Sequence, residues 1–214
     1  VLNYIVTSNH IHALVYSSED KKIIPNSLQL IAGRTAQEYN QRKSRKGAFW
    51  EDRYHATVVD TDEHLLQCLM YIDINMVKAR VVDHPKDWPH SGYHEIVSPP
   101  KRYRIIDRVK LLELLDSQEE RTLTRDYPEW VNEALGGQGT EREQKWTESI
   151  AVGCRSFVEV IKEKLGVRAV GRNTEEHHGS MILREPHSQY ANSDISAYRG
   201  NSVRQYDNML PWKE

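Results

Sequence analysis

The chain of 214 residues contains little cysteine, proline or glycine, and it has no long apolar run. Its two cysteines, Cys68 and Cys154, are too few for a disulfide framework or a cysteine-built zinc site, which favours a reducing, cytoplasmic location. The 8 prolines and 11 glycines exclude a collagen-like or low-complexity chain. The apolar runs are far shorter than the roughly 18 residues of a membrane span, and no signal peptide is visible, so we expect no membrane partner.

A strong excess of one charge is also missing, because 29 Lys and Arg stand against 31 Asp and Glu, for a net charge of −2. Bulk charge therefore predicts no nucleic-acid partner, and any basic footprint must be local. Residues 34–53 provide such a footprint, with six basic and three acidic residues interleaved with aromatic ones. Cations among aromatic rings suit single-stranded nucleic acid, although a solvated charged loop is the alternative. The predicted DNA-binding residues are Arg42, Lys43, Arg45, Lys46, Trp50 and Arg53.

Strand and helix signals alternate along the first half of the chain and predict an α+β fold, an antiparallel sheet with helices packed on it. Residues 4–16 are apolar and β-branched at both ends, and we expect them to form the central strand, with a second strand at residues 54–60. The helical spacing of apolar residues predicts helices over residues 27–39 and 62–77, packed on one face of the sheet.

The second half of the chain has weaker signals. Apolar spacing predicts short helices at residues 105–115 and 129–135, and one long or two short helices over residues 140–165. After Gly171 the polarity rises and the periodicity is lost, which predicts an irregular or disordered tail. The predicted division is a catalytic unit over residues 1–116, a helical extension over residues 117–171 and the tail over residues 172–214.

His10 and His12 are the first residues that suggest chemistry. Residues two apart in a strand point to the same face, so both imidazoles are expected on one side, with Ile11 in the core. Paired imidazoles suit a divalent cation, and Asn9 is placed to shape such a site. The alternative is a chance pairing in a chain that contains 10 histidines.

Tyr71 and Asn75 form a second candidate pair, because residues four apart share one face of a helix. The amide oxygen of Asn75 suits a hard cation such as Mg²⁺ or Mn²⁺. A phenol held beside such an ion could attack a phosphodiester. The alternative is that Tyr71 is a core tyrosine and Asn75 a residue at the end of a helix.

Four motifs, taken together and in order, resemble the REP-associated tyrosine transposases, a branch of the HUH endonuclease superfamily related to the single-tyrosine insertion-sequence transposases. The resemblance covers about residues 1–95, and Met76 stands where the family usually has proline. The motifs are TSNHIHALV at residues 7–15, GAFWEDRY at 47–54, YIDINMVKA at 71–79 and WPHSGY at 88–93.

The resemblance implies a ferredoxin-like HUH fold and a single-strand DNA endonuclease and strand transferase that acts beside hairpins and forms a 5′-phosphotyrosine. It implies Tyr71 as the nucleophile and Mg²⁺ or Mn²⁺ held by His10, His12 and Asn75. The implied partner is single-stranded or hairpin DNA, and the protein would be a monomer or a homodimer. Since the family's first strand and helix precede the histidine strand, we also expect a catalytic unit that is truncated at its amino terminus.

Two other functions stay open from the sequence. A truncated chain could bind a DNA hairpin without cutting it. A metallohydrolase could use His10 and His12 to hold a zinc-bound water, but no further histidine or carboxylate stands at a convincing ligand spacing. If Tyr71 is a core residue, Tyr54 is the next candidate nucleophile.

Overall fold

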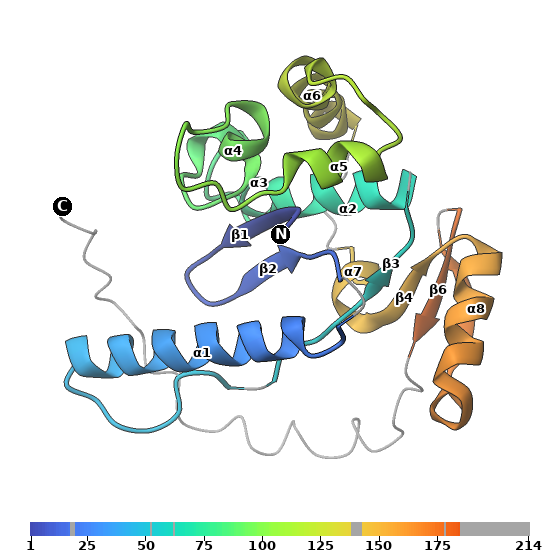
Figure 1. The fold of residues 1–214 in the computed structure, drawn as a ribbon, viewed down its shortest axis with the longest axis horizontal. Coiled ribbons are helices and arrows are strands. Elements are labelled where there is room, and N and C mark those ends of the chain that lie inside the picture. Colours follow the sequence, from blue (N-terminus) through green and yellow to red (C-terminus); the bar gives the residue numbers. More distant parts are fainter. Residues whose placement is uncertain (18–19, 52, 62, 138–142, 178, 185–214) are drawn as a thin grey trace.

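The computed structural model describes residues 1–17, 20–51, 53–61, 63–137, 143–177 and 179–184 (Figure 1). Its helices and two small sheets confirm the predicted α+β class. Within the described residues, no helix is both long and apolar enough to span a membrane. The elements that connect or cover the core are η1 (Pro85–Asp87), α4 (Tyr93–Val97), α5 (Arg108–Leu114), η2 (Thr122–Asp126), α6 (Tyr127–Gly137), α7 (Lys145–Glu148) and η3 (Gly166–Ala169).

The first sheet is a hairpin of β1 (Asn3–Val6) and β2 (Ile11–Leu14), with Ile5 opposite His12. The prediction of one central strand over residues 4–16 is therefore wrong. The chain turns at residues 7–10, where the Thr7 hydroxyl accepts a hydrogen bond from the His10 backbone N–H at 3.1 Å. Ser and Asn favour such turns because their side chains bond nearby backbone groups.

The second sheet has the strand order β3-β4-β6-β5, with β3 parallel to β4 and the other neighbours antiparallel. Helix α8 packs on β4 and β6, where Val158 contributes to a small core with Ala151 and Leu183. These elements are β3 (Val58–Val59), β4 (Ser149–Gly153), α8 (Arg155–Leu165), β5 (Asn173–His177) and β6 (Ser180–Arg184).

This second sheet corrects two expectations. One long or two short helices were expected over residues 140–165, but β4 lies between α7 and α8 in the described residues 143–165. The expected irregular tail is wrong for residues 173–177 and 180–184, which form two paired strands, while residues 185–214 lie outside the described part of the chain. Strand β6 is buried between β4 and β5, so tertiary pairing overrides its weak local signal.

Helix α2 (Glu63–Asp73) connects two hydrophobic clusters. One face carries Leu65 and Leu69 into a cluster that also contains Tyr127 of α6, and another face carries Tyr71 into a cluster with Val152 of β4. Residues on both sides of position 116 thus share one cluster. The domain boundary proposed there stays a prediction.

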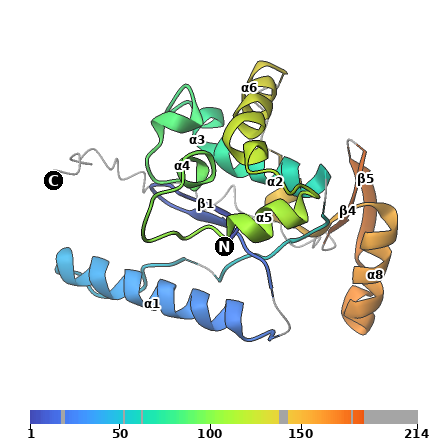
Figure 2. The same ribbon diagram turned by 45° about the horizontal axis from the view of Figure 1, so that its top comes forward.

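Helix α1 (Ile23–Arg42) departs from the expected packing. Helix α2 packs on both strands of the first hairpin, whereas none of the residues of α1 is buried, and Leu30 is 64% exposed. Both views place the hairpin between α2 and α1 (Figures 1 and 2). The prediction that the two helices share one face of a sheet is therefore wrong, because α1 packs mainly against its own following loop.

Candidate active site

The two predicted metal-binding histidines lie side by side, His10 at the end of the β1–β2 turn and His12 on β2. The ring centroids of His10 and His12 are 4.7 Å apart, with an interplanar angle of 72°. Nδ1 of His10 lies 2.8 Å from Oδ1 of Asn9 and 3.1 Å from Oγ1 of Thr7. A hydrogen bond at one ring nitrogen orients an imidazole and leaves the other nitrogen available to a ligand. That Asn9 shapes a metal site stays a prediction.

The face of β2 that points into the molecule is the one that carries His12, not the predicted one that carries Ile11. His12 and Leu14 are half-buried, while Ile11 is 41% exposed. Because side chains alternate between faces and α2 covers only one of them, His12 turns towards the helix and Ile11 away from it. The expectation that Ile11 enters the core is therefore wrong, since Ile11 is exposed on the face away from α2.

Tyr71 lies directly against this histidine pair. Its ring centroid is 5.6 Å from that of His12, and its side chain is only 5% exposed. On the other side lies Trp146 of α7, with 6.2 Å between the centroids. The structure thus brings His10, His12 and Tyr71 together from the hairpin and α2, and adds an aromatic wall from a segment 75 positions away.

Asn75, the third predicted metal ligand, is half-buried and begins the short helix α3 (Asn75–Lys78). The chain leaves the regular helix at Ile74 (φ −81°, ψ 3°), so Tyr71 and Asn75 do not belong to one continuous helix as expected. The role of Asn75 as a ligand stays a prediction.

The two neighbouring imidazoles of His10 and His12 are donors that suit a divalent ion. No group of three histidine, cysteine, aspartate or glutamate side chains gathers as a metal site among the residues that the structure describes. A catalytic zinc ion usually takes three such ligands, so the described residues lend the zinc-hydrolase alternative no support.

The sequence did not indicate the polar group beside Tyr71. Glu143 accepts a hydrogen bond from Nζ of Lys78 at 2.7 Å and from Nε1 of Trp146 at 3.1 Å. Nζ of Lys78 lies 6.0 Å from the centroid of the Tyr71 ring. Because Glu143 is 65 positions from Lys78, no local spacing could reveal the pair, and only the motif around residue 78 offered a signal.

Burial tends to raise the pKa of the Glu143 carboxyl, but the hydrogen bond and charge of Lys78 outweigh burial and lower the pKa below its usual value. Lys145 adds a second cation, since its buried ammonium lies 3.7 Å from Glu143 and donates to Gln67 of α2 at 3.1 Å. Segment 143–146 is thereby attached to α2 by the Lys145–Gln67 hydrogen bond and by the contact of Trp146 with Tyr71, and to α3 by the Glu143–Lys78 ion pair.

The predicted DNA-binding residues gather at the end of α1 and in the loop after it. Arg42, Lys43, Arg45, Lys46 and Arg53 are all exposed. The loop turns back along the helix, because Asn40 Nδ2 donates to the Gly47 carbonyl at 2.9 Å and Trp50 Nε1 donates to the Ala32 carbonyl at 3.0 Å. Trp50 is half-buried, so its ring secures the loop, and DNA contact by this group stays a prediction.

The WPHSGY segment, residues 88–93, makes hydrogen bonds with β1, the strand that precedes the histidine turn. Trp88 Nε1 donates to the Val6 carbonyl at 3.0 Å, the Val6 N–H donates to the His90 carbonyl at 2.8 Å, and the Gly92 N–H donates to the Tyr4 carbonyl at 2.7 Å. This segment therefore lies along β1 and fixes the end of the strand that leads into the histidine turn.

Comparison with known proteins finds similarity to transposases in the part of the chain that carries His10, His12 and Tyr71. Residues 1–75 match the family model described as "Transposase IS200 like", which confirms the resemblance to this class of transposases over that part of the chain. A stretch of 58 residues is 36% identical to the "Putative REP-associated tyrosine transposase" of Haemophilus influenzae. That match covers 27% of this chain and spans about a third (33%) of the length of the relative. No solved structure is significantly similar.

Proposed function

We propose that this chain is a metal-dependent single-strand DNA endonuclease and strand transferase, a transposase that acts at hairpin-associated sites. The observation that supports this most directly is the contact of the Tyr71 ring with His12, 5.6 Å between centroids, inside the region that matches the transposase family. A phenol next to two paired imidazoles is the arrangement that a tyrosine nucleophile needs.

In the proposed reaction the Tyr71 oxygen forms a bond to the phosphorus of the scissile phosphodiester and gives up its proton. The bond from phosphorus to the 3′ oxygen breaks, and that oxygen keeps the electron pair and takes up a proton. The products are a 5′-phosphotyrosine and a free 3′-hydroxyl. Since the phosphotyrosine conserves the energy of the broken bond, the reverse attack by another 3′-hydroxyl needs no nucleotide cofactor.

The chain's own residues position these groups. His12 and Trp146 confine the Tyr71 ring from two sides, which lowers the entropic cost of aligning the phenol with phosphorus. His10, His12 and Asn75 would hold Mg²⁺ or Mn²⁺. A divalent ion at that place would polarise the phosphate and offset the charge that develops on it.

The proposed cleavage reaction also determines which form of DNA the chain would bind. Cleavage of this type needs an unpaired strand, because the scissile phosphate must reach a phenol in a confined site. The exposed cations at the end of α1 would hold the phosphates on either side of that point, and they carry no sequence information of their own.

The test is a denaturing gel of the full chain with a labelled hairpin oligonucleotide and Mn²⁺. Wild type is expected to give a shifted covalent band, and Tyr71→Phe is expected to lose it while still binding the oligonucleotide. The matched control is Tyr54→Phe, a tyrosine that is 56% exposed and outside the Tyr71 cluster. A band that persists in Tyr71→Phe and disappears in Tyr54→Phe would assign the nucleophile to Tyr54. Binding without any band from wild type would favour the hairpin-binding protein that does not cut.

A further inference from the structure

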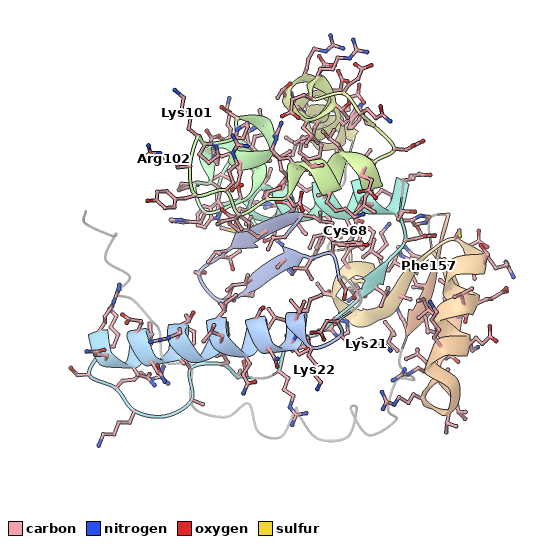
Figure 3. The ribbon with its side chains drawn as sticks, viewed as in Figure 1. Lys21, Lys22, Cys68, Lys101, Arg102 and Phe157 are labelled. Atoms are coloured by element: carbon pink, nitrogen blue, oxygen red, sulfur yellow. The ribbon has the colours of Figure 1, made fainter. Side chains whose placement is uncertain are left out.

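The loop between α4 and α5 contains a basic and aromatic sequence that the site described above does not use, Lys101-Arg102-Tyr103-Arg104. All four residues are exposed, and Tyr103 is 94% exposed. Figure 3 shows Lys101 and Arg102 extending outward from this loop. The loop thus places three cations beside one fully accessible aromatic ring.

The loop is anchored at both ends. Oε1 of Glu95, a side chain that is 7% exposed, accepts hydrogen bonds from the backbone N–H groups of Ile105 and Ile106, each at 2.7 Å. The Asp107 N–H donates to the Val1 carbonyl at 2.9 Å, and Arg104 Nε donates to the Pro100 carbonyl at 2.9 Å. These hydrogen bonds hold the backbone on both sides of Tyr103, while its ring remains exposed.

Tyr103 has a left-handed backbone, with φ 58°. This conformation is uncommon and strained for a bulky residue, and strain of this kind is retained where the surrounding structure imposes it, often at ligand sites. Within the described residues, the Tyr103 ring takes part in none of the aromatic or cation–π contacts. Packing inside the chain therefore does not account for the tyrosine at this place.

The three cations are not neutralised locally. In the described part of the chain, none of them forms an ion pair with an acidic side chain, whereas Arg42 pairs with Glu38 and Arg125 with Asp126. Although the chain as a whole has a net charge of −2, these three cations form a local cluster of positive charge beside the exposed Tyr103 ring. Lys and Arg beside an exposed aromatic ring are the components that bind single-stranded nucleic acid, with phosphates on the cations and a base on the ring.

The position of the loop fits a strand that passes the candidate active site. Figures 1 and 2 both show the loop between α4 and α5 on the same side of the molecule as the β1–β2 turn. The segment that leads into α4 pairs with β1 through Gly92 and Tyr4, and β1 leads directly into the turn that carries His10.

We propose that residues 101–104 are a second nucleic-acid contact, at which Lys101 and Arg102 hold backbone phosphates and Tyr103 stacks on one unpaired base. The ligand is single-stranded DNA that flanks the hairpin, and the inference rests on the proposed function for this substrate. This contact is separate from the group at the end of α1 and adds an element that stacks on bases.

The experiment measures binding of the full chain, without metal, to a labelled hairpin with a single-stranded extension, across a series of salt concentrations. For Lys101→Gln combined with Arg102→Gln we expect weaker binding and a salt slope lower by about 1.4, since each lost phosphate contact on a single strand removes about 0.7. For Tyr103→Ala we expect roughly tenfold weaker binding with the slope unchanged, and for Tyr103→Phe nearly wild-type affinity.

Two controls make the result specific. Lys162→Gln combined with Lys164→Gln removes two cations from α8, away from this side of the molecule, and should leave affinity and slope unchanged. Tyr103→Ala should not weaken binding to a fully paired duplex, because paired bases offer no face for stacking.

Wild-type affinity and slope in all the loop variants would overturn the inference while leaving the proposed function intact. An equal loss by Tyr103→Ala on single-stranded and duplex DNA would also overturn it, since stacking could not be the cause. A wild-type chain that binds neither oligonucleotide would overturn the inference and the proposed function together.

Discussion

The hydroxyl of Tyr127 donates a 2.5 Å hydrogen bond to Oδ2 of Asp73, which lies 54 positions earlier in the chain. Nδ2 of Asn3 donates to the other carboxyl oxygen at 2.9 Å. Burial raises the pKa of Asp73 to about 7, in spite of these two hydrogen bonds, which act in the opposite direction. The group joins α6 and β1 to the last turn of α2, two residues after Tyr71, and so links the tyrosine helix to the histidine hairpin.

Tyr127→Phe should destabilise the fold although it removes a single oxygen atom. The change leaves Oδ2 of a carboxyl that is 1% exposed without its donor, and an unsatisfied buried polar group costs about 1–3 kcal/mol. Urea denaturation followed by circular dichroism measures the free energy of unfolding. The control is Tyr103→Phe, at an exposed tyrosine, which should change stability by less than about 0.5 kcal/mol. Equal stability of the two variants would show that the buried hydrogen bond contributes little.

Gly92 is required by close packing beside the same group. A Cβ atom at this position would lie 2.3 Å from Oδ1 of Asn3 and 2.7 Å from Cδ1 of Ile106. Gly92→Ala is therefore expected to cost about 1–3 kcal/mol through strain. Gly136→Ala on α6 is the matched control, because a Cβ there meets nothing within 4 Å and alanine favours a helix. Thermal unfolding of both variants checks the contrast, and a Gly92→Ala protein as stable as wild type contradicts it.

The parts of the fold that follow local rules could be predicted. Helices α1 and α2 follow from apolar spacing, and their observed bounds lie within a few residues of the expected ones. The turn at residues 7–10 is hard to predict because apolar, β-branched residues flank its polar residues and suggest one continuous strand, although Ser8-Asn9 is also a turn signal. Strands β4 and β6 were missed because their pairing depends on partners about thirty positions away.

The candidate site was predictable where the chemistry lies in short motifs. His10, His12 and Tyr71 could be found because a two-residue spacing and a helix-borne tyrosine suggest shared faces before any coordinates exist. Glu143 and Trp146 could not be found, because they reach Tyr71 through tertiary packing of an extension that lies outside the matched family region. The sequence thus predicted the candidate residues that the structure brings together, but not Glu143 and Trp146 beside them.

Glu143→Gln should reduce stability in a way that depends on pH. The Glu143 pKa is lowered in the folded chain relative to its usual value of 4.5, so its ionised form stabilises the fold. That contribution is complete above the unfolded pKa and is lost as the pH falls through the lower, folded pKa. The difference in unfolding free energy between wild type and variant should therefore be largest near pH 7 and should diminish as the pH falls below the usual carboxyl pKa of 4.5.

Glu113→Gln is the matched control for this experiment. Glu113 also pairs with a lysine, Lys110, but its side chain is 65% exposed, so removal of its charge should change stability little at any pH. Unfolding free energies of both variants, measured at several pH values, separate the two cases. A constant difference between wild type and Glu143→Gln from pH 7 to pH 3 would contradict a role for the ionised pair.

The last prediction concerns the cations after α1, and it separates their contribution from that of the loop at residues 101–104. Lys43 and Lys46 are the best positions to test, because both are exposed, whereas Arg45 donates to the Ala48 carbonyl at 2.7 Å and helps to hold the loop. Lys43→Gln combined with Lys46→Gln should weaken DNA binding by a similar factor on every sequence, since phosphate contacts do not distinguish bases.

The salt dependence provides the diagnostic measurement. Loss of two phosphate contacts on a single strand should lower the salt slope by about 1.4, and the same change on duplex DNA should lower it by about 1.8. The α8 variants at Lys162 and Lys164 again serve as the control. When the substitutions at residues 43 and 46 are combined with those at residues 101 and 102, the losses should add, because separate contacts contribute independently. An affinity that is unchanged at both low and high salt would remove these lysines from the DNA interface, and a loss on one sequence alone would mean that they contact bases instead.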